Sequence, residues 1–395
     1  MAAPSALLYA PAMLLSHREL FEVPRDIAYL NNGSYTPLPR PVRAAGEAGV
    51  AEKSRPWTMD PAAITRRADA VREAAAGFIR ATADDIAIVH SAAYGIATAA
   101  ANLPVERGTR ILLIEGEFPS LALEWAALAE ARGATLDIVA RPSDGDWTSA
   151  LLDRITASGL PPVGIAALTP LVWTDGSLID LERLTPKLRE QGAAIVIDAT
   201  QAAGILPLDA GRLGADYMAF PTYKWLLGPY TLAFLYVAPW RQDGMPLERH
   251  GSNHQGGSEP FPGRLPKLIG SARRFDMGQR FNPVSLPMAR AGMELLHGWG
   301  QQALAARLRA TTNRLAEHAS ACGLEPVPPP FRAPHILGLR VPDGGAARLV
   351  EELAARQVYV AERGGRIRIG AHIFNDEEDT ARFGAALESA VGRVA

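Results

Sequence analysis

Between about residues 60 and 240, short apolar runs alternate with longer stretches whose apolar residues recur at helical spacing. The short runs predict strands and the longer stretches predict helices. The expected strands are residues 86–90, 110–114, 136–140, 163–168, 194–198 and 216–220, and the expected helices are residues 96–103, 121–132, 148–157 and 181–191. This alternation predicts an α/β fold with a mostly parallel sheet covered by helices. Such sheets bind ligands at the carboxyl ends of their strands.

The pattern changes after residue 240, where residues 241–283 are rich in glycine, proline and charge and predict a long loop. The elements expected beyond it are helices at 285–296, 302–321, 346–357 and 377–391, and strands near 335–340 and 366–369. We therefore expect a large domain (31–284) and a small α+β carboxyl-terminal domain (285–395). Residues 1–30, which include the apolar stretch 6–15, are expected to form an arm packed on the body, with a cleaved signal peptide as the alternative.

Composition excludes several classes of protein. The chain has 395 residues, is 48% hydrophobic and 21% charged, and carries a formal net charge of -2, which is typical of a globular enzyme and indicates no nucleic-acid partner. Its one cysteine, Cys322, excludes an intramolecular disulfide and a cysteine-based metal cluster, and we assign no metal ligands. No apolar run approaches the ~18 residues of a membrane span. A cytoplasmic protein without a membrane partner is expected.

Asp198 and Lys224 are the residues that predict chemistry most directly. Asp198 ends the apolar run 194–198, Gln201 follows three residues later, and Lys224 lies in an otherwise apolar turn. A lysine that forms a Schiff base and a carboxylate that keeps a pyridine nitrogen protonated are the groups that bind pyridoxal 5'-phosphate (PLP). Burial lowers a lysine pKa and frees the neutral amine. The structural alternatives are Asp198 as a helix N-cap and Lys224 as a strand-edge lysine reaching solvent.

The segments Ile197–Gln201 and Tyr223–Tyr230 together resemble the class V aminotransferase branch of the fold-type I PLP enzymes. That branch includes cysteine desulfurases, selenocysteine lyases, kynureninases and isopenicillin N epimerase-like proteins. Residues 29–39, 117–125 and 368–375 are similar to three further motifs of the family, so the resemblance covers nearly the whole chain. Several motifs in the right order are a specific signal. The resemblance implies a fold-type I architecture with a mostly parallel, seven-stranded sheet in the large domain.

The resemblance also implies how the cofactor is held. Gln201 would hydrogen-bond its phenolic oxygen, and Phe118 would lie on the ring face, where many relatives have histidine. Trp173 would line its edge, with core packing as the alternative. The phosphate would bind at the strand-to-helix turn that starts at Ser91, where backbone N–H groups and the helix dipole attract an anion, and Tyr223 would add a hydroxyl.

Two positions in that turn depart from many relatives. Ala92 and Ala93 stand where threonine or serine is common, so phosphate binding would depend on backbone N–H groups and be weaker. Residues 274–279 resemble the segment through which a neighbouring subunit reaches the phosphate. Gly278 and Gln279 would therefore contribute to the partner's site in a homodimer with shared sites.

Arg368 would bind the α-carboxylate of a small amino-acid substrate as a bidentate fork. Three further residues are expected at the rim of the substrate site: Asn32, Tyr35 and His372.

The reaction is left open between three alternatives. The segment 358–366 contains no cysteine and Cys322 reads as structural, so desulfuration through an enzyme persulfide is not expected. The leading hypothesis is a lyase or epimerase that acts at the α-carbon through a Lys224 Schiff base. The second is an aminotransferase with a keto-acid acceptor. The third is a PLP-binding scaffold with little turnover, which the presence of Asp198, Lys224 and Arg368 together argues against.

Overall fold

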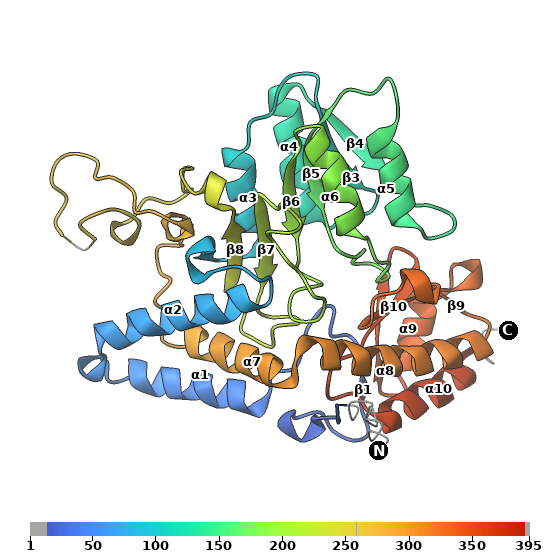
Figure 1. Ribbon diagram of the computed structural model, residues 1–395. Helices are drawn as coiled ribbons and strands as arrows, with labels where there is room; N and C mark the ends of the chain where they lie inside the picture. Colours follow the sequence, from blue (N-terminus) through green and yellow to red (C-terminus); the bar gives the residue numbers. More distant parts are fainter. Residues whose placement is uncertain (1–13, 258, 392–395) are drawn as a thin grey trace, which may run out of the picture.

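The computed structural model describes residues 14–257 and 259–391, so most of the apolar stretch 6–15 lies outside the described residues. The centre of the fold is a seven-stranded sheet with the order β2–β8–β7–β6–β5–β3–β4 (Figure 1). Its strands are β2 (Ile86–Val89), β3 (Arg110–Ile114), β4 (Thr135–Val139), β5 (Val163–Leu168), β6 (Ala194–Asp198), β7 (Tyr217–Pro221) and β8 (Ala233–Val237). β8 pairs antiparallel with β2 and β7, and the other strand pairs of the sheet are parallel. The predicted α/β fold with a mostly parallel sheet is confirmed.

Helices cover both faces of this sheet, because alternate strand residues face opposite ways and both sets are apolar. One face carries α3 (Ala92–Asn102) and α4 (Pro119–Arg132), and the other carries α2 (Pro61–Gly77), α5 (Trp147–Thr156) and α6 (Leu181–Glu190). In β3, Leu113 belongs to the same core cluster as Trp125 of α4, whereas Leu112 belongs to the cluster that contains Trp147 of α5. The helices expected from the sequence at α3 to α6 are therefore present.

The strand β8 and two helices, α2 and one at residues 40–53, were not expected from the sequence. β8 was missed because β7 and β8 are joined by the Lys224 turn without a helix, so the alternation of strand and helix does not hold there. The helix α1 (Arg40–Lys53) was missed because it buries only Val42, Gly46 and Gly49, which give little hydrophobic periodicity. Those glycines allow close packing: a Cβ at position 49 would lie 2.2 Å from the backbone oxygen of Pro283.

The carboxyl-terminal region contains an antiparallel sheet of four strands. Their order is β12 (Ala361–Arg363), β13 (Arg366–Gly370), β10 (Ile336–Arg340) and β9 (Glu325–Pro326), and the helices of this region are α7 (Ser285–Trp299), α8 (Gln301–Ala321), α9 (Ala346–Ala354) and α10 (Glu377–Val391). Helices α8, α9 and α10 pack together around this sheet, whereas α7 packs on α1 and α2. The domain boundary at residue 285 stays a prediction.

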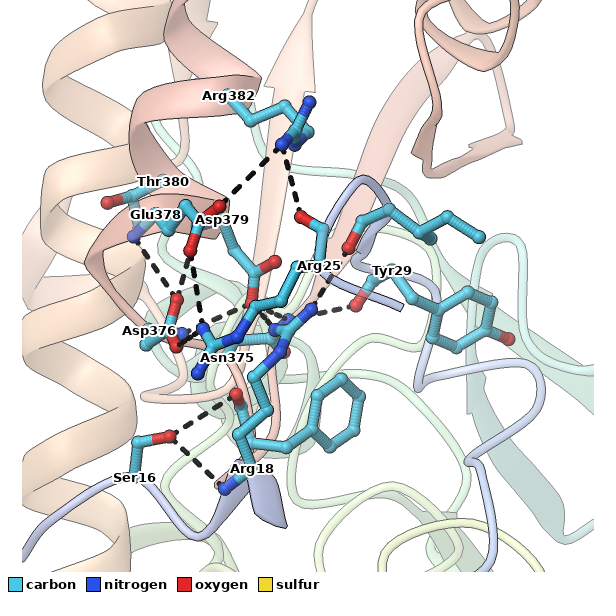
Figure 2. A network of polar contacts seen from close by, with 12 residues as sticks. Ser16, Arg18, Arg25, Tyr29, Asn375, Asp376, Glu378, Asp379, Thr380 and Arg382 are labelled. Carbon is cyan, nitrogen blue, oxygen red and sulfur yellow. Dashed lines mark hydrogen bonds and ion pairs between the residues drawn. The ribbon is translucent and has the colours of Figure 1, made fainter. Parts of the chain in front are cut away.

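A buried ion pair attaches the amino-terminal segment to α10 (Figure 2). Arg18 Nη1 lies 2.6 Å from Asp379 Oδ2, and its Nη2 donates to the carbonyl oxygens of Pro24 and Ile27. Asn375 Nδ2 donates to the Tyr29 carbonyl oxygen over 3.0 Å. The segment continues as β1 (Ala28–Tyr29), which pairs in parallel with β11 (Val358–Tyr359). These contacts fix the path of the residues that follow β1.

The loop expected at 241–283 contains short 3-10 helices, at Gly251–Asn253 and Ala272–Phe275, and part of it extends away from the sheet (gold in Figure 1). Among the described residues, no helix combines the length and the apolar character needed to cross a bilayer.

Candidate active site

A cavity of about 290 Å³ opens where β6 and β7 end and α3 begins; we call it the main cavity. Nearly all residues assigned to the cofactor from the sequence line it: Ser91, Ala92, Ala93, Phe118, Trp173, Asp198, Gln201, Tyr223 and Lys224. Asp198 and Lys224 lie close together because Asp198 ends β6 and Lys224 lies in the turn between β7 and β8. Both positions are at the same edge of the sheet.

Lys224 is a buried amine with 7% of its surface exposed. Burial lowers the pKa of Lys224 from 10.5 to about 8; the Asp198 carboxylate opposes this shift, whereas Arg368 and Arg363 add to it. The turn is held by Thr222, whose hydroxyl donates to the carbonyl oxygens of Pro229 and Leu232. The alternative that Lys224 is a solvated strand-edge residue does not match this environment.

Asp198 lines the main cavity, is half-buried and has few partners. Its Oδ1 accepts from the backbone N–H of Thr200 over 2.8 Å, but turns rather than a helix follow, so Asp198 is not the helix N-cap of the structural alternative. Burial nevertheless raises its pKa, and the cation Lys224 only partly offsets this. A protonated pyridine nitrogen would supply the cationic donor that this carboxylate lacks.

The start of α3 offers free donors for an anion. Ser91 caps the helix, because its Oγ accepts from the N–H of Tyr94 over 3.1 Å. Within the described part of the chain, no acceptor is recorded for the N–H groups of Ala92 and Ala93. These donors and the positive end of the helix suit a phosphate group, although neither alanine adds a hydroxyl.

Gln201 has one donor left for a ligand. Its Oε1 accepts from Trp225 Nε1 over 2.7 Å, and its Nε2 donates to the Gly33 carbonyl oxygen over 3.1 Å. One Nε2 hydrogen is not used by these two bonds. This orientation suits an oxygen acceptor such as the cofactor's phenolic oxygen.

Phe118 and Trp173 form an aromatic wall. Their ring centroids lie 5.2 Å apart in an edge-to-face contact, and Lys224 Nζ lies 5.7 Å from the Phe118 centroid. Glu117, to which the sequence assigned no role, also lines the main cavity. Its Oε1 accepts from the Phe118 N–H, whereas its Oε2 is buried without a hydrogen-bond partner. Burial raises the pKa of Glu117 to about 8, with the Asp198 charge adding to the shift.

A second hollow, which we call the arginine cavity, shares Lys224 with the main cavity. Its lining residues are Gly33, Ser34, Tyr35, Phe118, Trp173, Tyr223, Lys224, Tyr230, Arg363 and Arg368. Arg368 is 2% exposed and donates to the Trp173 carbonyl oxygen over 3.0 Å. Burial and the neighbouring Arg363 lower the pKa of Arg368 to about 10. The sequence placed Arg368 and Tyr35 near a substrate, but it did not identify Ser34 or Arg363.

Two residues expected at the rim do not lie there. Asn32 is completely buried and donates from Nδ2 to the Gly370 carbonyl oxygen over 2.8 Å. His372 is also completely buried; it stacks on Trp225, and burial lowers its pKa to about 3. Neither lines the main cavity or the arginine cavity, so neither occupies the expected rim position. Asn32 directly precedes Gly33, which lines the arginine cavity, whereas His372 lies four residues after Arg368; the direction of the two side chains could not be read from the sequence.

Three other residues lie away from both cavities. Gly278 donates from its N–H to Glu248 Oε2 over 2.8 Å, and Gln279 is exposed next to it. Their role toward a partner subunit stays a prediction. Cys322 follows α8, where burial raises its pKa.

Curated relatives match nearly the whole chain. A probable cysteine desulfurase of Methanothermobacter thermautotrophicus is 24% identical, covering 93% of this chain and 96% of that protein. An isopenicillin N epimerase of Amycolatopsis lactamdurans is 26% identical over 94% of this chain and 97% of that protein. A kynureninase of Deinococcus radiodurans is 29% identical over 67% of this chain and 64% of that protein. These relatives are named for different reactions, so similarity to them does not identify the reaction of this chain.

Solved structures show the same fold. The apo cysteine desulfurase of Thermococcus onnurineus NA1 superposes with a TM-score of 0.83 at 19% identity, covering 95% of this chain and 97% of that chain. The cystine C-S lyase C-DES, solved with cysteine persulfide, gives a TM-score of 0.80 at 22% identity over 92% and 97% of the two chains. The family model described as aminotransferase class-V matches residues 29–383. The chain belongs to the aminotransferase class-V family and is a PLP-dependent enzyme.

Proposed function

We propose that this enzyme takes the α-proton of a small amino acid and then eliminates a side-chain group or returns the proton with inversion, as a lyase or an epimerase. The observation that supports this most is the position of Lys224. Its amine lies where the main cavity and the arginine cavity meet, and its pKa is about 8. Bound PLP supplies an electron-withdrawing ring that makes the α-proton acidic.

Each neighbouring residue has a distinct task in this proposal. Asp198 would pair with the protonated nitrogen of the cofactor ring, and Arg368 would hold the α-carboxylate of the substrate near Lys224. The neutral amine of Lys224 accepts that proton, because a base whose pKa lies near the working pH transfers protons in both directions. Phe118, in the aromatic wall, excludes water and offers no proton. Cys322 lies outside both cavities, so no step uses an enzyme persulfide.

An assay for keto acids, with and without an added keto-acid acceptor, separates the alternatives. A lyase releases a keto acid without an acceptor, and an epimerase converts one enantiomer to the other, which chiral chromatography detects. Product that requires the acceptor would establish an aminotransferase instead. If no amino acid is converted under either condition, the remaining hypothesis is a PLP-binding scaffold with little turnover.

Borohydride reduction followed by peptide mass spectrometry tests the role of Lys224. The cofactor adduct is expected on Lys224, and Lys224→Ala should lose both the adduct and turnover. Lys187→Ala is the matched control, because Lys187 lies exposed on α6 and pairs with Glu190. An adduct on any other lysine contradicts the assignment.

We also propose that the active form is a homodimer in which Gly278 and Gln279 approach the partner's phosphate site. The support is that this segment is accessible and lies outside the main cavity of its own subunit. Mixing Lys224→Ala with a Gln279→Ala variant tests this, because a hybrid dimer would contain one intact site. Recovered activity on mixing and reassembly supports shared sites, and a monomer in sedimentation experiments contradicts them.

A further inference from the structure

Two guanidinium groups in the arginine cavity bind the same hydroxyl. Ser34 Oγ accepts from Arg368 Nη2 over 2.5 Å and from Arg363 Nη2 over 3.2 Å. Arg363 ends β12, Arg368 lies in β13, and the two strands are joined through Gly364 and Gly365. Both glycines have positive φ, which permits this tight turn and brings the two arginines to one side of the hairpin.

Neither guanidinium has an ion-pair partner within residues 14–257 and 259–391. Among the other buried arginines, Arg18, Arg72 and Arg110 each pair with an aspartate, whereas Arg332 donates to Asn313 Oδ1 and the Val327 carbonyl oxygen and has no ion pair within the described residues. No aspartate or glutamate lines the arginine cavity. Lys224, whose charge is opposed by Asp198 in the main cavity, lies at the edge of the arginine cavity, which therefore carries two guanidinium groups without a protein counter-ion among the described residues.

The arrangement is electrostatically costly without a ligand. The charge of Arg363 contributes to the lowered pKa of Arg368, and both arginines contribute to that of Lys224. Like charges held together in a partly buried site are stabilised when an anion binds between them. An amino acid with an uncharged side chain brings one carboxylate, which Arg368 binds in the proposed function. Arg363 is then left without a counter-ion.

We propose that the substrate is an α-amino acid whose side chain carries a second negatively charged group, a carboxylate or a sulfinate, and that Arg363 binds this group. The inference rests on the proposed function for the role of Arg368. The cavity, at about 230 Å³, admits a short side chain. Tyr35 and Tyr230 are the exposed residues of its lining, and their hydroxyls add polar groups to the cavity without negative charge.

Titration of the holoenzyme with matched pairs of amino acids tests this inference. Aspartate is compared with asparagine, glutamate with glutamine, and cysteine sulfinate with alanine, by following the cofactor's absorption spectrum. At least one acidic amino acid is expected to bind ~10-fold or more tightly than its neutral counterpart, as one charge-assisted hydrogen bond provides. In Arg363→Gln the ratio of acidic to neutral affinity should fall toward one, and Arg363→Lys should recover part of it. Arg366→Gln is the control, because Arg366 belongs to the same hairpin but lies 3.9 Å from Asp175 and outside the cavity.

Binding of glutarate and succinate to the holoenzyme, measured by calorimetry, separates this inference from the proposed function. These dicarboxylates have no amine and undergo no α-carbon chemistry. If they bind in a manner that depends on Arg363 while no amino acid changes the spectrum, the acidic-ligand inference holds and the proposed function fails. Equal affinity for acidic and neutral amino acids, or an equal loss for both in Arg363→Gln, would overturn the inference and show that both arginines hold one carboxylate.

Discussion

Trp225 Nε1 donates a hydrogen bond to Gln201 Oε1 over 2.7 Å, and Trp225 directly follows Lys224 in the chain. The bond settles which end of the Gln201 amide is the oxygen, because indole N–H is only a donor. One Nε2 hydrogen of Gln201, which lines the main cavity, remains free. The Lys224 turn and the cofactor donor on Gln201 are therefore positioned by one contact.

Replacing Trp225 by phenylalanine should lower the free energy of unfolding, because it removes this hydrogen bond. Trp225→Phe leaves the buried Gln201 Oε1 without a donor, which costs about 1–3 kcal/mol of unfolding free energy. Urea unfolding measures the loss, and Trp57→Phe is the control because Trp57 is 79% exposed. Adding Gln201→Leu to Trp225→Phe should cost less than the sum of the two single changes. If the losses of the two single variants simply add in the double variant, the hydrogen bond does not couple Trp225 and Gln201 energetically.

Lys224 in the apoprotein should react with amine reagents at lower pH than ordinary lysines do. Its pKa of about 8 means that the neutral amine becomes abundant as the pH rises through 8 rather than 10.5. Peptide mass spectrometry after brief labelling at pH 6 to 11 gives the midpoint for each lysine, with Lys187 as the exposed reference. A Lys224 midpoint that coincides with that of Lys187 would contradict the lowered pKa.

Glu117 should make the stability of the apoprotein dependent on pH. Its folded-state pKa of about 8 lies above the ordinary value of 4.5, so its stabilising contribution is complete below pH 4.5 and is lost as the pH rises through 8. Between pH 6 and 9 the wild type should therefore lose a few kcal/mol of unfolding free energy that Glu117→Gln does not lose. Glu130→Gln, at an exposed position on α4, should follow the wild type. If the unfolding free energy depends on pH in the same way in Glu117→Gln and in the wild type, the raised pKa of Glu117 is refuted.

Arg18 should contribute far more stability than Arg25, although both pair with acidic residues at the start of α10 (Figure 2). Arg18→Met leaves the buried Asp379 carboxylate without its counter-ion and should cost about 3–5 kcal/mol in urea unfolding. Arg25 is 62% exposed, so Arg25→Met should unfold close to the wild type. Similar losses in the two variants would show that burial does not distinguish the pairs.

Most strands of the large sheet could be predicted because their local pattern is sufficient. The runs at β3, β5 and β6 are continuously apolar, are bounded by polar residues and are separated by helices, and their observed bounds equal the predicted ones. β8 was not predicted because its position depends on pairing with β2 and β7, and the local alternation of strands and helices does not encode this pairing.

Some residues of the candidate site could likewise be predicted from the sequence, and others could not. Asp198 and Lys224 stand at the ends of recognisable runs, so the fold alone brings them to one edge of the sheet. Ser34 and Arg363 meet across more than 300 residues, and no local pattern marks either of them. Asn32 and His372 lie in recognisable motifs, but only the packing of the backbone decides that they face inward.

The hairpin that carries Arg363 and Arg368 follows every residue of the main cavity in the order of synthesis. Residues that line the main cavity, from His90 to Leu232, leave the ribosome long before this hairpin does. The loop with Ser34 emerges first but is held by β11 and α10, which emerge late. The residues that line the main cavity are therefore all synthesised before either arginine, and the arginine cavity cannot form until both arginines have been added to the chain.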